Sequence, residues 1–234
     1  MAAPADRRPL LLGHRGCRTS EFCENSIAAF EHSLASGCDG FEFDVRQTSD
    51  KKFVCVHDEG IRRCDVAAND YEKLCKQYLN YWTGPKRTEI ALLQDVLTRF
   101  SNRAFLDIEL KVPGMEAEVA GLLKGMNPGY HVVSSFLPDV LRRMSEIDSK
   151  IPLGYISRRL DAVQIWTKLP VKYVIPRHDL VSHELIAAVH DAGCKLLTWT
   201  VNRPKEMLAL AEWGVDGIIS DDPALLSETL SPTR

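Results

Sequence analysis

The sequence lacks long hydrophobic runs and a strong excess of charge of either sign. Its longest unbroken apolar stretches, 185–189 and 207–211, are five residues long, whereas a helix that crosses a membrane needs about 20. The 29 lysines and arginines nearly balance the 32 aspartates and glutamates, and the net charge is −3. This balance does not predict a nucleic-acid partner or binding to an anionic membrane. We therefore expect no transmembrane segment, and the apolar content of 45% argues against disorder.

A cysteine framework and an export signal are also missing. The seven cysteines are odd in number and contain no CxxC pair, which disfavours a disulfide scaffold and a structural zinc site. Cys38, Cys55 and Cys194 stand among apolar residues and are predicted to be buried thiols. The basic residues near the N-terminus precede only a short apolar stretch at 10–12, which is not a signal-peptide core. We expect a cytoplasmic protein.

Short apolar segments alternate with amphipathic ones along the whole chain, and no linker or low-complexity tract separates them. The predicted strands are 9–13, 40–45, 104–110, 131–135, 152–156, 172–175, 195–201 and 217–220. The predicted helices lie near 25–36, 89–100, 115–126, 137–148, 160–168, 181–192, 203–213 and 222–230. Eight strands in alternation with eight helices predict a (β/α)8 TIM barrel, as a single domain over 1–234 with its core at about 9–230. A doubly wound open sheet is the rival, but the first turn, Gly13–Cys17, is not a GxGxxG loop.

Charged residues interrupt two of the predicted strands in an alternating pattern. In the segment 41–45, Glu42 and Asp44 fall on the face opposite to Phe41, Phe43 and Val45. The segment 106–111 places Asp107, Glu109 and Lys111 on one face in the same way. Barrel strands turn apolar side chains to the helices, so these charged residues are predicted to point into the barrel. Asp107 lies one layer deeper than Glu109 and is expected to be structural.

Two further apolar segments end in histidine, at His14-Arg15 and at His57-Asp58. The carboxyl ends of barrel strands form the active-site mouth. The mouth is therefore predicted to hold two histidines, three carboxylates, one arginine and one lysine. The predicted set is His14, Arg15, Glu42, Asp44, His57, Glu109 and Lys111.

This set of side chains limits the chemistry. Three crowded carboxylates repel one another unless a cation neutralises them, and oxygen ligands suit one divalent ion, Mg²⁺ or Ca²⁺. His14 and His57 are candidates for general acid and base, and Arg15 and Lys111 beside a metal suit a phosphate group. The structural alternative is a buried ion-pair network in which Arg15 and Lys111 merely neutralise the carboxylates.

An ordered set of motifs resembles the glycerophosphodiester phosphodiesterase family. The motifs run in order from about residue 10 to residue 226. They are Gly13-His14-Arg15-Gly16, Glu24-Asn25-Ser26, Glu42-Phe43-Asp44-Val45, Thr48-Ser49-Asp50, Val56-His57-Asp58, Glu109-Leu110-Lys111, Ser135-Phe136, Trp199-Thr200-Val201-Asn202 and Asp216–Pro223. The sequence departs from the family at 58–64 and at Asp50-Lys51-Lys52, where the family has an Asp-Gly turn.

The resemblance implies a metal-dependent enzyme that hydrolyses glycerophosphodiesters, small-molecule substrates, to glycerol 3-phosphate and an alcohol. It implies the same roles for the seven mouth residues, with Glu42, Asp44 and Glu109 as metal ligands, and it adds Trp199 as a residue that shapes the glycerol pocket. The alternatives are a lysophospholipase D or phospholipase C-like lipid phosphodiesterase, and a phosphate-binding module without catalysis. A homo-oligomer is also compatible with the sequence.

Several residues around the mouth have two interpretations. The segment 58–87 is predicted to be a long loop or cap with a helix near 69–77, and its aromatic residues either recognise the leaving alcohol or pack over the barrel edge. Those residues are Tyr71, Tyr78, Tyr81 and Trp82. Glu24 is expected to cap a helix rather than to orient His14 or Arg15, and 221–223 to cap the last helix.

Overall fold

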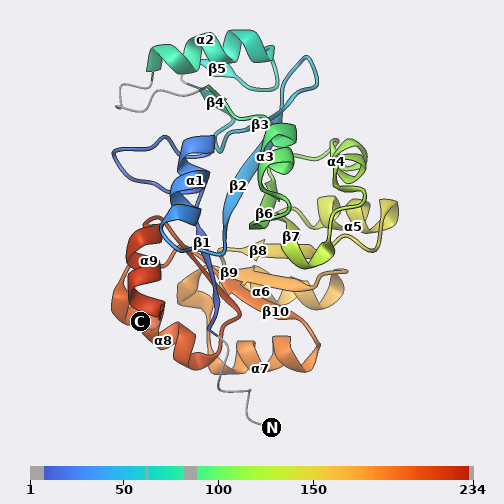
Figure 1. Ribbon diagram of the computed structural model, residues 1–234. Helices are drawn as coiled ribbons and strands as arrows, with labels where there is room; N and C mark the ends of the chain where they lie inside the picture. Colours follow the sequence, from blue (N-terminus) through green and yellow to red (C-terminus); the bar gives the residue numbers. More distant parts are fainter. Residues whose placement is uncertain (1–7, 62, 82–88, 232–234) are drawn as a thin grey trace.

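The computed structural model describes residues 8–61, 63–81 and 89–231 of the chain. Eight parallel strands form a closed barrel in the order β1-β11-β10-β9-β8-β7-β6-β2, and β2 pairs with β1 to close it (Figure 1). They are β1 (Leu10–Gly13), β2 (Gly40–Gln47), β6 (Phe105–Leu110), β7 (His131–Ser135), β8 (Leu153–Ser157), β9 (Tyr173–Pro176), β10 (Lys195–Thr198) and β11 (Gly217–Ser220). The predicted (β/α)8 barrel is confirmed, and the open sheet is excluded.

Helices surround the barrel on its outside (Figure 1). They are α1 (Ile27–Ala35), α3 (Leu93–Phe100), α4 (Glu116–Leu123), α5 (Pro138–Ile147), α6 (Leu160–Val163), α7 (His183–Asp191), α8 (Pro204–Trp213) and α9 (Pro223–Leu230). Short 3₁₀ turns occur at η1 (Pro128–Tyr130), η2 (Gln164–Lys168) and η3 (His178–Leu180). Ser26, Ser182 and Asp222 accept a backbone N–H at the starts of α1, α7 and α9. No helix in the described ranges has both the length and the apolar character that a membrane crossing requires.

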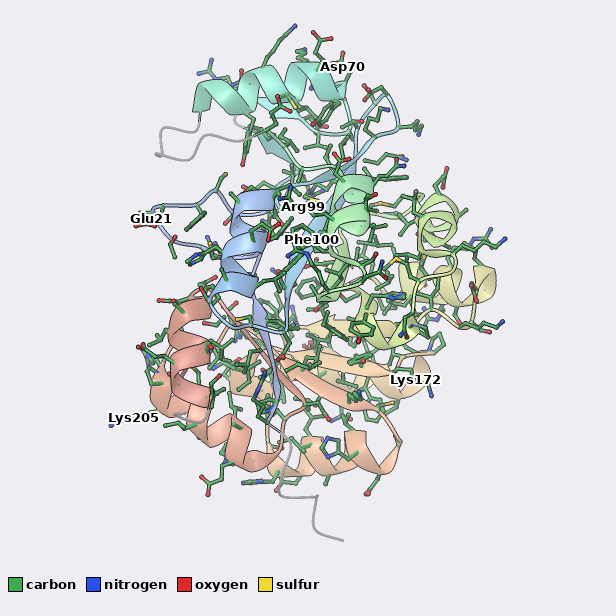
Figure 2. All side chains as sticks on the ribbon, viewed as in Figure 1. Glu21, Asp70, Arg99, Phe100, Lys172 and Lys205 are labelled. Atoms are coloured by element: carbon green, nitrogen blue, oxygen red, sulfur yellow. The ribbon has the colours of Figure 1, made fainter. Side chains whose placement is uncertain are left out.

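The alternation read from the sequence sorts the side chains of β2 correctly. Phe41 and Phe43 face outward, and Phe41 stacks on Phe30 of α1 at a ring distance of 4.3 Å. Phe100 of α3, labelled in Figure 2, meets Phe41 edge-on at a ring distance of 5.0 Å. Glu42 and Asp44 consequently point into the barrel. A second cluster fills the barrel interior below them, with Leu12, Phe105, Val132, Ile156, Tyr173, Ile175, Leu197 and Ile219.

An insertion follows β2 and sits above the barrel (Figure 1). The strand that leads to His57 is β3 (Phe53–Cys55), and it pairs antiparallel with the end of β2 rather than joining the barrel. Beyond it come the hairpin β4 (Gly60–Ile61) and β5 (Cys64–Asp65), then α2 (Tyr71–Tyr81). Buried Val54, Val56, Ile61, Val66, Leu74 and Ile90 hold the insertion together.

The contacts of Tyr71 and Tyr78 indicate whether these aromatic residues pack within the protein or remain available to a ligand. Tyr71 packs against the insertion's apolar cluster, and its hydroxyl donates to the carbonyl of Ile90 at 2.8 Å, which fits the packing interpretation. The Tyr78 hydroxyl instead bonds to Cys23 Sγ. The side chain of Tyr81 and all of Trp82 lie outside the described residues.

Two of the three cysteines that the sequence predicts to be buried are buried in the structure. Cys38 and Cys55 are buried as predicted, but Cys194 is only partly buried and donates to the carbonyl of Val171. It begins the turn into β10, where the helices do not cover it fully. The boundaries of the single domain stay a prediction.

Candidate active site

A cavity of about 510 Å³ opens at the carboxyl ends of the barrel strands. Seven of the eight residues singled out in the sequence line it, and Asp44 lies directly behind them, 1% exposed. The lining comprises His14, Arg15, Glu42, Arg46, His57, Asp58, Glu59, Asp107, Glu109, Lys111, Phe136, Ile156, Arg158, Ile175, Trp199 and Ile219. The structure therefore brings residues from β1, β2, β6, β10 and the β3 insertion to one place.

Three buried carboxylates form the floor of one side of this cavity. One oxygen each of Glu42, Asp44 and Glu109 lies within 4.8 Å of the others. Asp44 and Glu109 are direct neighbours in the β2–β6 register. This grouping follows from parallel pairing, because equivalent positions on adjacent strands place their side chains side by side.

Two basic side chains, Lys111 and Arg15, form ion pairs with this cluster. Lys111 Nζ lies 2.7 Å from Glu109 Oε1 and 3.2 Å from Asp44 Oδ1. Arg15 Nε lies 3.3 Å from Asp44 Oδ2 without meeting hydrogen-bond geometry, and it has no other hydrogen-bond partner among the described residues. The ion-pair network predicted as the structural alternative is present. It involves the same residues as the predicted metal site, so the two interpretations are compatible.

The cluster holds more negative charge than its two cations neutralise. Burial opposes ionisation of Asp44, but Lys111 and Arg15 outweigh it and hold the pKa of Asp44 below its usual value. Burial and the Asp44 charge raise the pKa of Glu109 to about 7, and they raise that of Glu42 well above its ordinary value. A divalent cation among these oxygens would remove this penalty, so the donor set and its charge fit a hard metal ion.

His14 is anchored by the last strand of the barrel. Its backbone N–H donates to the carbonyl of Ser220 at 2.7 Å, and its ring Nδ1 donates to Asp221 Oδ1 at 2.6 Å. Its Nε2 then faces the cluster, 3.9 Å from Glu42 Oε2. Burial opposes ionisation of Asp221, yet hydrogen bonds from His14 and Asn202 lower its pKa, so the carboxylate stays charged.

His57 is held by its immediate neighbour in the insertion. Its Nδ1 lies 2.7 Å from Asp58 Oδ1, and its backbone carbonyl accepts a hydrogen bond from Arg46 Nε at 2.9 Å. Burial lowers the pKa of His57, so the imidazole is neutral at neutral pH.

The loop between β1 and α1 fixes the position of Arg15. Its φ of 52° is left-handed, and its backbone N–H donates to Glu42 Oε2 at 2.9 Å. Glu24 accepts from Arg15 Nη1 at 2.7 Å, whereas Ser26 caps α1. The expectation that Glu24 caps a helix is therefore wrong, because the chain reaches the cap two residues later. Asn25 Nδ2 donates to Asp44 Oδ2 at 2.7 Å.

Two contacts of the site histidines are not predicted by the sequence. The expectation that 221–223 cap the last helix holds for Asp222, whereas Asp221 turns to His14. Asp58 appears in the sequence only within a motif, and in the structure its carboxylate lies against Nδ1 of His57. For Asp221 the available signal was its place directly after a predicted strand, the same signal that identified His14.

Apolar and aromatic side chains line the cavity opposite the carboxylates. Trp199 Nε1 donates to the carbonyl of Ile175 at 3.0 Å, and its ring meets Phe136 edge-on at 5.6 Å. Asp107 lies at the base, fully buried, and accepts from Ser134 Oγ at 2.5 Å. The structural role expected for Asp107 agrees with this position.

Comparison with known proteins identifies the family. A model of the glycerophosphoryl diester phosphodiesterase family matches residues 14–225. The chain belongs to this family. A glycerophosphodiester phosphodiesterase from Bacillus altitudinis is 30% identical over 234 residues, covering 91% of this chain and 94% of its own length. One from Caldanaerobacter subterraneus is 29% identical over 239 residues, covering 94% and 96%.

Solved structures of the family share the fold. A glycerophosphodiester phosphodiesterase from Thermotoga maritima superposes with a TM-score of 0.80 at 22% identity, covering 95% of this chain and 98% of its own. A phosphodiesterase from Oleispira antarctica, solved with the product sn-glycerol-3-phosphate, gives 0.79 at 21% identity and covers 95% and 96%. As a member of the glycerophosphoryl diester phosphodiesterase family the chain is an enzyme, which replaces the alternative of a phosphate-binding module.

One departure from the family pattern has a visible structural consequence. Lys51 occupies the turn between β2 and β3, where the resemblance implies glycine, and it takes a left-handed φ of 64°. A residue with a Cβ atom is strained there, yet the turn is kept.

Proposed function

We propose that the enzyme hydrolyses glycerophosphodiesters to glycerol 3-phosphate and an alcohol, with His14 and His57 as its acid–base pair. One observation carries the proposal. Two imidazoles, each held at Nδ1 by a carboxylate, face a cavity whose floor is a buried cluster of three carboxylates and two cations. A phosphodiester needs a proton removed from the nucleophile and another delivered to the leaving oxygen, and this arrangement supplies one group for each task.

Glu42, Asp44 and Glu109 are the proposed ligands of one divalent ion, Mg²⁺ or Ca²⁺. Their oxygens lie close enough for one ion to bind all three. Burial, together with the charge of Asp44, raises the pKa of Glu42 and Glu109, and a bound cation would offset this penalty. When bound, such an ion would polarise the phosphoryl oxygens and offset the charge that develops on them.

The side chains then divide the work. Arg15 and Lys111 bind phosphate oxygens, since both guanidinium and ammonium lie at the cavity wall beside the cluster. Trp199 shapes the side of the pocket that receives the glycerol moiety. The Asp221 and Asp58 contacts fix each imidazole with Nε2 toward the substrate, so that a proton is exchanged at that atom. The nucleophile is water or the 2-hydroxyl of the glycerol itself, which would give a cyclic phosphate first.

A second candidate is a lysophospholipase D or another lipid phosphodiesterase. Leu137 and Leu160 follow the carboxyl ends of β7 and β8, next in sequence to Phe136 and close to Arg158, which line the cavity, and they are 38% and 73% exposed. A human lysophospholipase D is 23% identical over 267 residues, covering 93% of this chain and 83% of its own length. An acyl chain could extend over these leucines.

The deciding experiment is a product analysis. The protein reconstituted with Mg²⁺ or Ca²⁺ is incubated with water-soluble glycerophosphodiesters and, separately, with lysophospholipids, and phosphorus NMR identifies the products. We expect glycerol 3-phosphate from the soluble substrates. Turnover of the lipids alone would contradict the proposal and favour the second candidate.

A further inference from the structure

A second cavity of about 470 Å³ lies beside the first. It is enclosed by the loop that precedes α1 and by the insertion that carries β4 and α2, two segments that stand next to each other above the barrel (Figure 1). Its walls combine apolar and aromatic side chains, among them Phe22, Val56, Ile61 and Tyr78, with polar and charged ones that include Arg18, Glu24 and Asp58.

The two cavities share His57 and Asp58 as a common wall. A phosphodiester carries two substituents on its phosphorus. If the phosphate sits at the carboxylate cluster and glycerol lies in the first cavity, the other substituent has to leave past His57. The second cavity lies on that side of His57.

The geometry points to the second cavity as the binding site of the leaving alcohol, and we infer that it takes an uncharged alcohol with a carbon skeleton of several atoms. This inference rests on the proposed function and names the substrate class more closely. With the phosphate at the carboxylate cluster and glycerol in the first cavity, the ester oxygen of the alcohol would lie beside His57, which borders both cavities. The rest of the alcohol would then extend into the second cavity.

Charge in the wall supports an uncharged alcohol. Arg18 Nε lies 2.7 Å from Glu24 Oε2, and the second oxygen of Glu24 accepts from Arg15. Asp58, the remaining carboxylate of the wall, is paired with His57 Nδ1 at 2.7 Å. Each charge in the wall thus has a partner within the protein, which disfavours a cationic or zwitterionic headgroup such as choline or serine. Thr19 Oγ1 is buried and lacks a hydrogen-bond partner among the described residues, so it can bond to a hydroxyl of the ligand.

Tyr78 belongs to the site, whereas Tyr71 on the same helix does not. The Tyr78 hydroxyl bonds to Cys23 Sγ across the cavity wall, which joins α2 to the loop before α1. Tyr71 turns to Ile90 and does not line the cavity. This contrast provides a matched control within one helix.

The test compares glycerophosphate esters of methanol, butanol and hexanol with glycerophosphocholine. For the wild-type enzyme we expect kcat/KM to rise from methyl to hexyl by up to about fourfold for each methylene that becomes buried. The Ile61→Trp variant fills the cavity and should lose the preference for the hexyl over the methyl ester. Tyr71→Phe should behave as the wild type.

A second variant at the same position tests the inference even if Ile61→Trp fails to fold. Ile61→Ala removes apolar contacts and enlarges the cavity instead of filling it, and it should lower the hexyl preference several-fold through KM, with circular dichroism checking the fold. Equal kcat/KM for methyl and hexyl esters in the wild type, a choline ester that outperforms the hexyl ester, or an unchanged hexyl preference in both Ile61 variants would overturn the inference alone. Failure to hydrolyse any of the esters would overturn the proposed function and the inference with it.

Discussion

The two histidines of the active site are supported in very different ways. His14 is carried by β1 and bonded to the end of β11, and its side chain and that of Asp221 are 12% and 24% exposed. His57 is carried by an insertion outside the barrel, and its side chain and that of Asp58 are 36% and 80% exposed. One half of the proposed acid–base pair therefore depends on the barrel itself and the other on a separately packed unit.

This difference has a functional meaning. A hydrogen bond to a partly buried carboxylate is worth more than one to an exposed carboxylate, because water competes with the exposed one. The barrel half should be rigid and sensitive to substitution, whereas the insertion half should tolerate change in Asp58 and adapt to different alcohols.

The largest expected effect is the loss of either imidazole. His14→Ala and His57→Ala should each lower kcat by roughly 10²–10⁴-fold, because each removes a general acid or base. Both variants should keep the metal affinity of the wild type, as measured by isothermal titration calorimetry, since neither histidine is a proposed ligand. Wild-type activity in either variant would show that the ring is not catalytic.

Substitution of the carboxylate that holds each histidine should lower kcat by different amounts in the barrel and in the insertion. Asp221→Asn should lower kcat by about 10- to 100-fold, the value of a charged hydrogen bond in a partly buried site. Asp58→Asn should cost less than about fivefold, as exposed ion pairs do. Steady-state kinetics on one soluble diester measures both, and equal losses would remove the distinction between a barrel half and an insertion half.

The pH dependence of metal binding should come from the carboxylates on the barrel strands and not from the insertion. Because the pKa of Glu109 is raised to about 7 and that of Glu42 is raised well above its ordinary value, protons on these carboxyls compete with a metal ion in the metal-free protein. Affinity for Mg²⁺ or Ca²⁺ should therefore rise with pH through the pKa of Glu109, by about tenfold per unit for each proton displaced. The Asp58→Asn variant should follow the same curve in calorimetry, whereas Glu109→Gln should flatten it.

The smallest effect concerns the turn that leads into the insertion. Lys51→Gly should raise the free energy of unfolding by up to about 1 kcal/mol, because glycine adopts the left-handed φ of 64° without strain. Lys52→Gly is the control, since φ at Lys52 is not left-handed, and it should not stabilise the protein. Urea denaturation of the two variants makes the comparison, and a destabilising Lys51→Gly would contradict it.

The barrel was predictable because its signals are periodic and local. Alternation in β2 and β6 located Glu42, Asp44 and Glu109 on the inner face before any coordinates, since parallel strands keep that order in space. Glycines 37, 193 and 214 follow helices and take a left-handed φ, which is the common position of glycine after a helix C-terminus. These features need only the residues of one element and its neighbours.

The remaining features depend on contacts that sequence spacing does not encode. Asp221 and His14 lie 207 positions apart, and only barrel closure brings them together. The hairpin β4–β5 has two residues in each strand, too few to show a period. Glu24 was misassigned because an acidic residue before a helix serves equally well as a cap or as the partner of Arg15.

A crystal structure of the protein with Mn²⁺, a cation that also prefers carboxylate ligands, gives the most direct test of the metal-centred site. We expect one anomalous peak in contact with Glu42, Asp44 and Glu109, between the rings of His14 and His57. An ion bound elsewhere, or a soaked crystal in which Lys111 still bridges Asp44 and Glu109 with no ion beside them, would contradict the site.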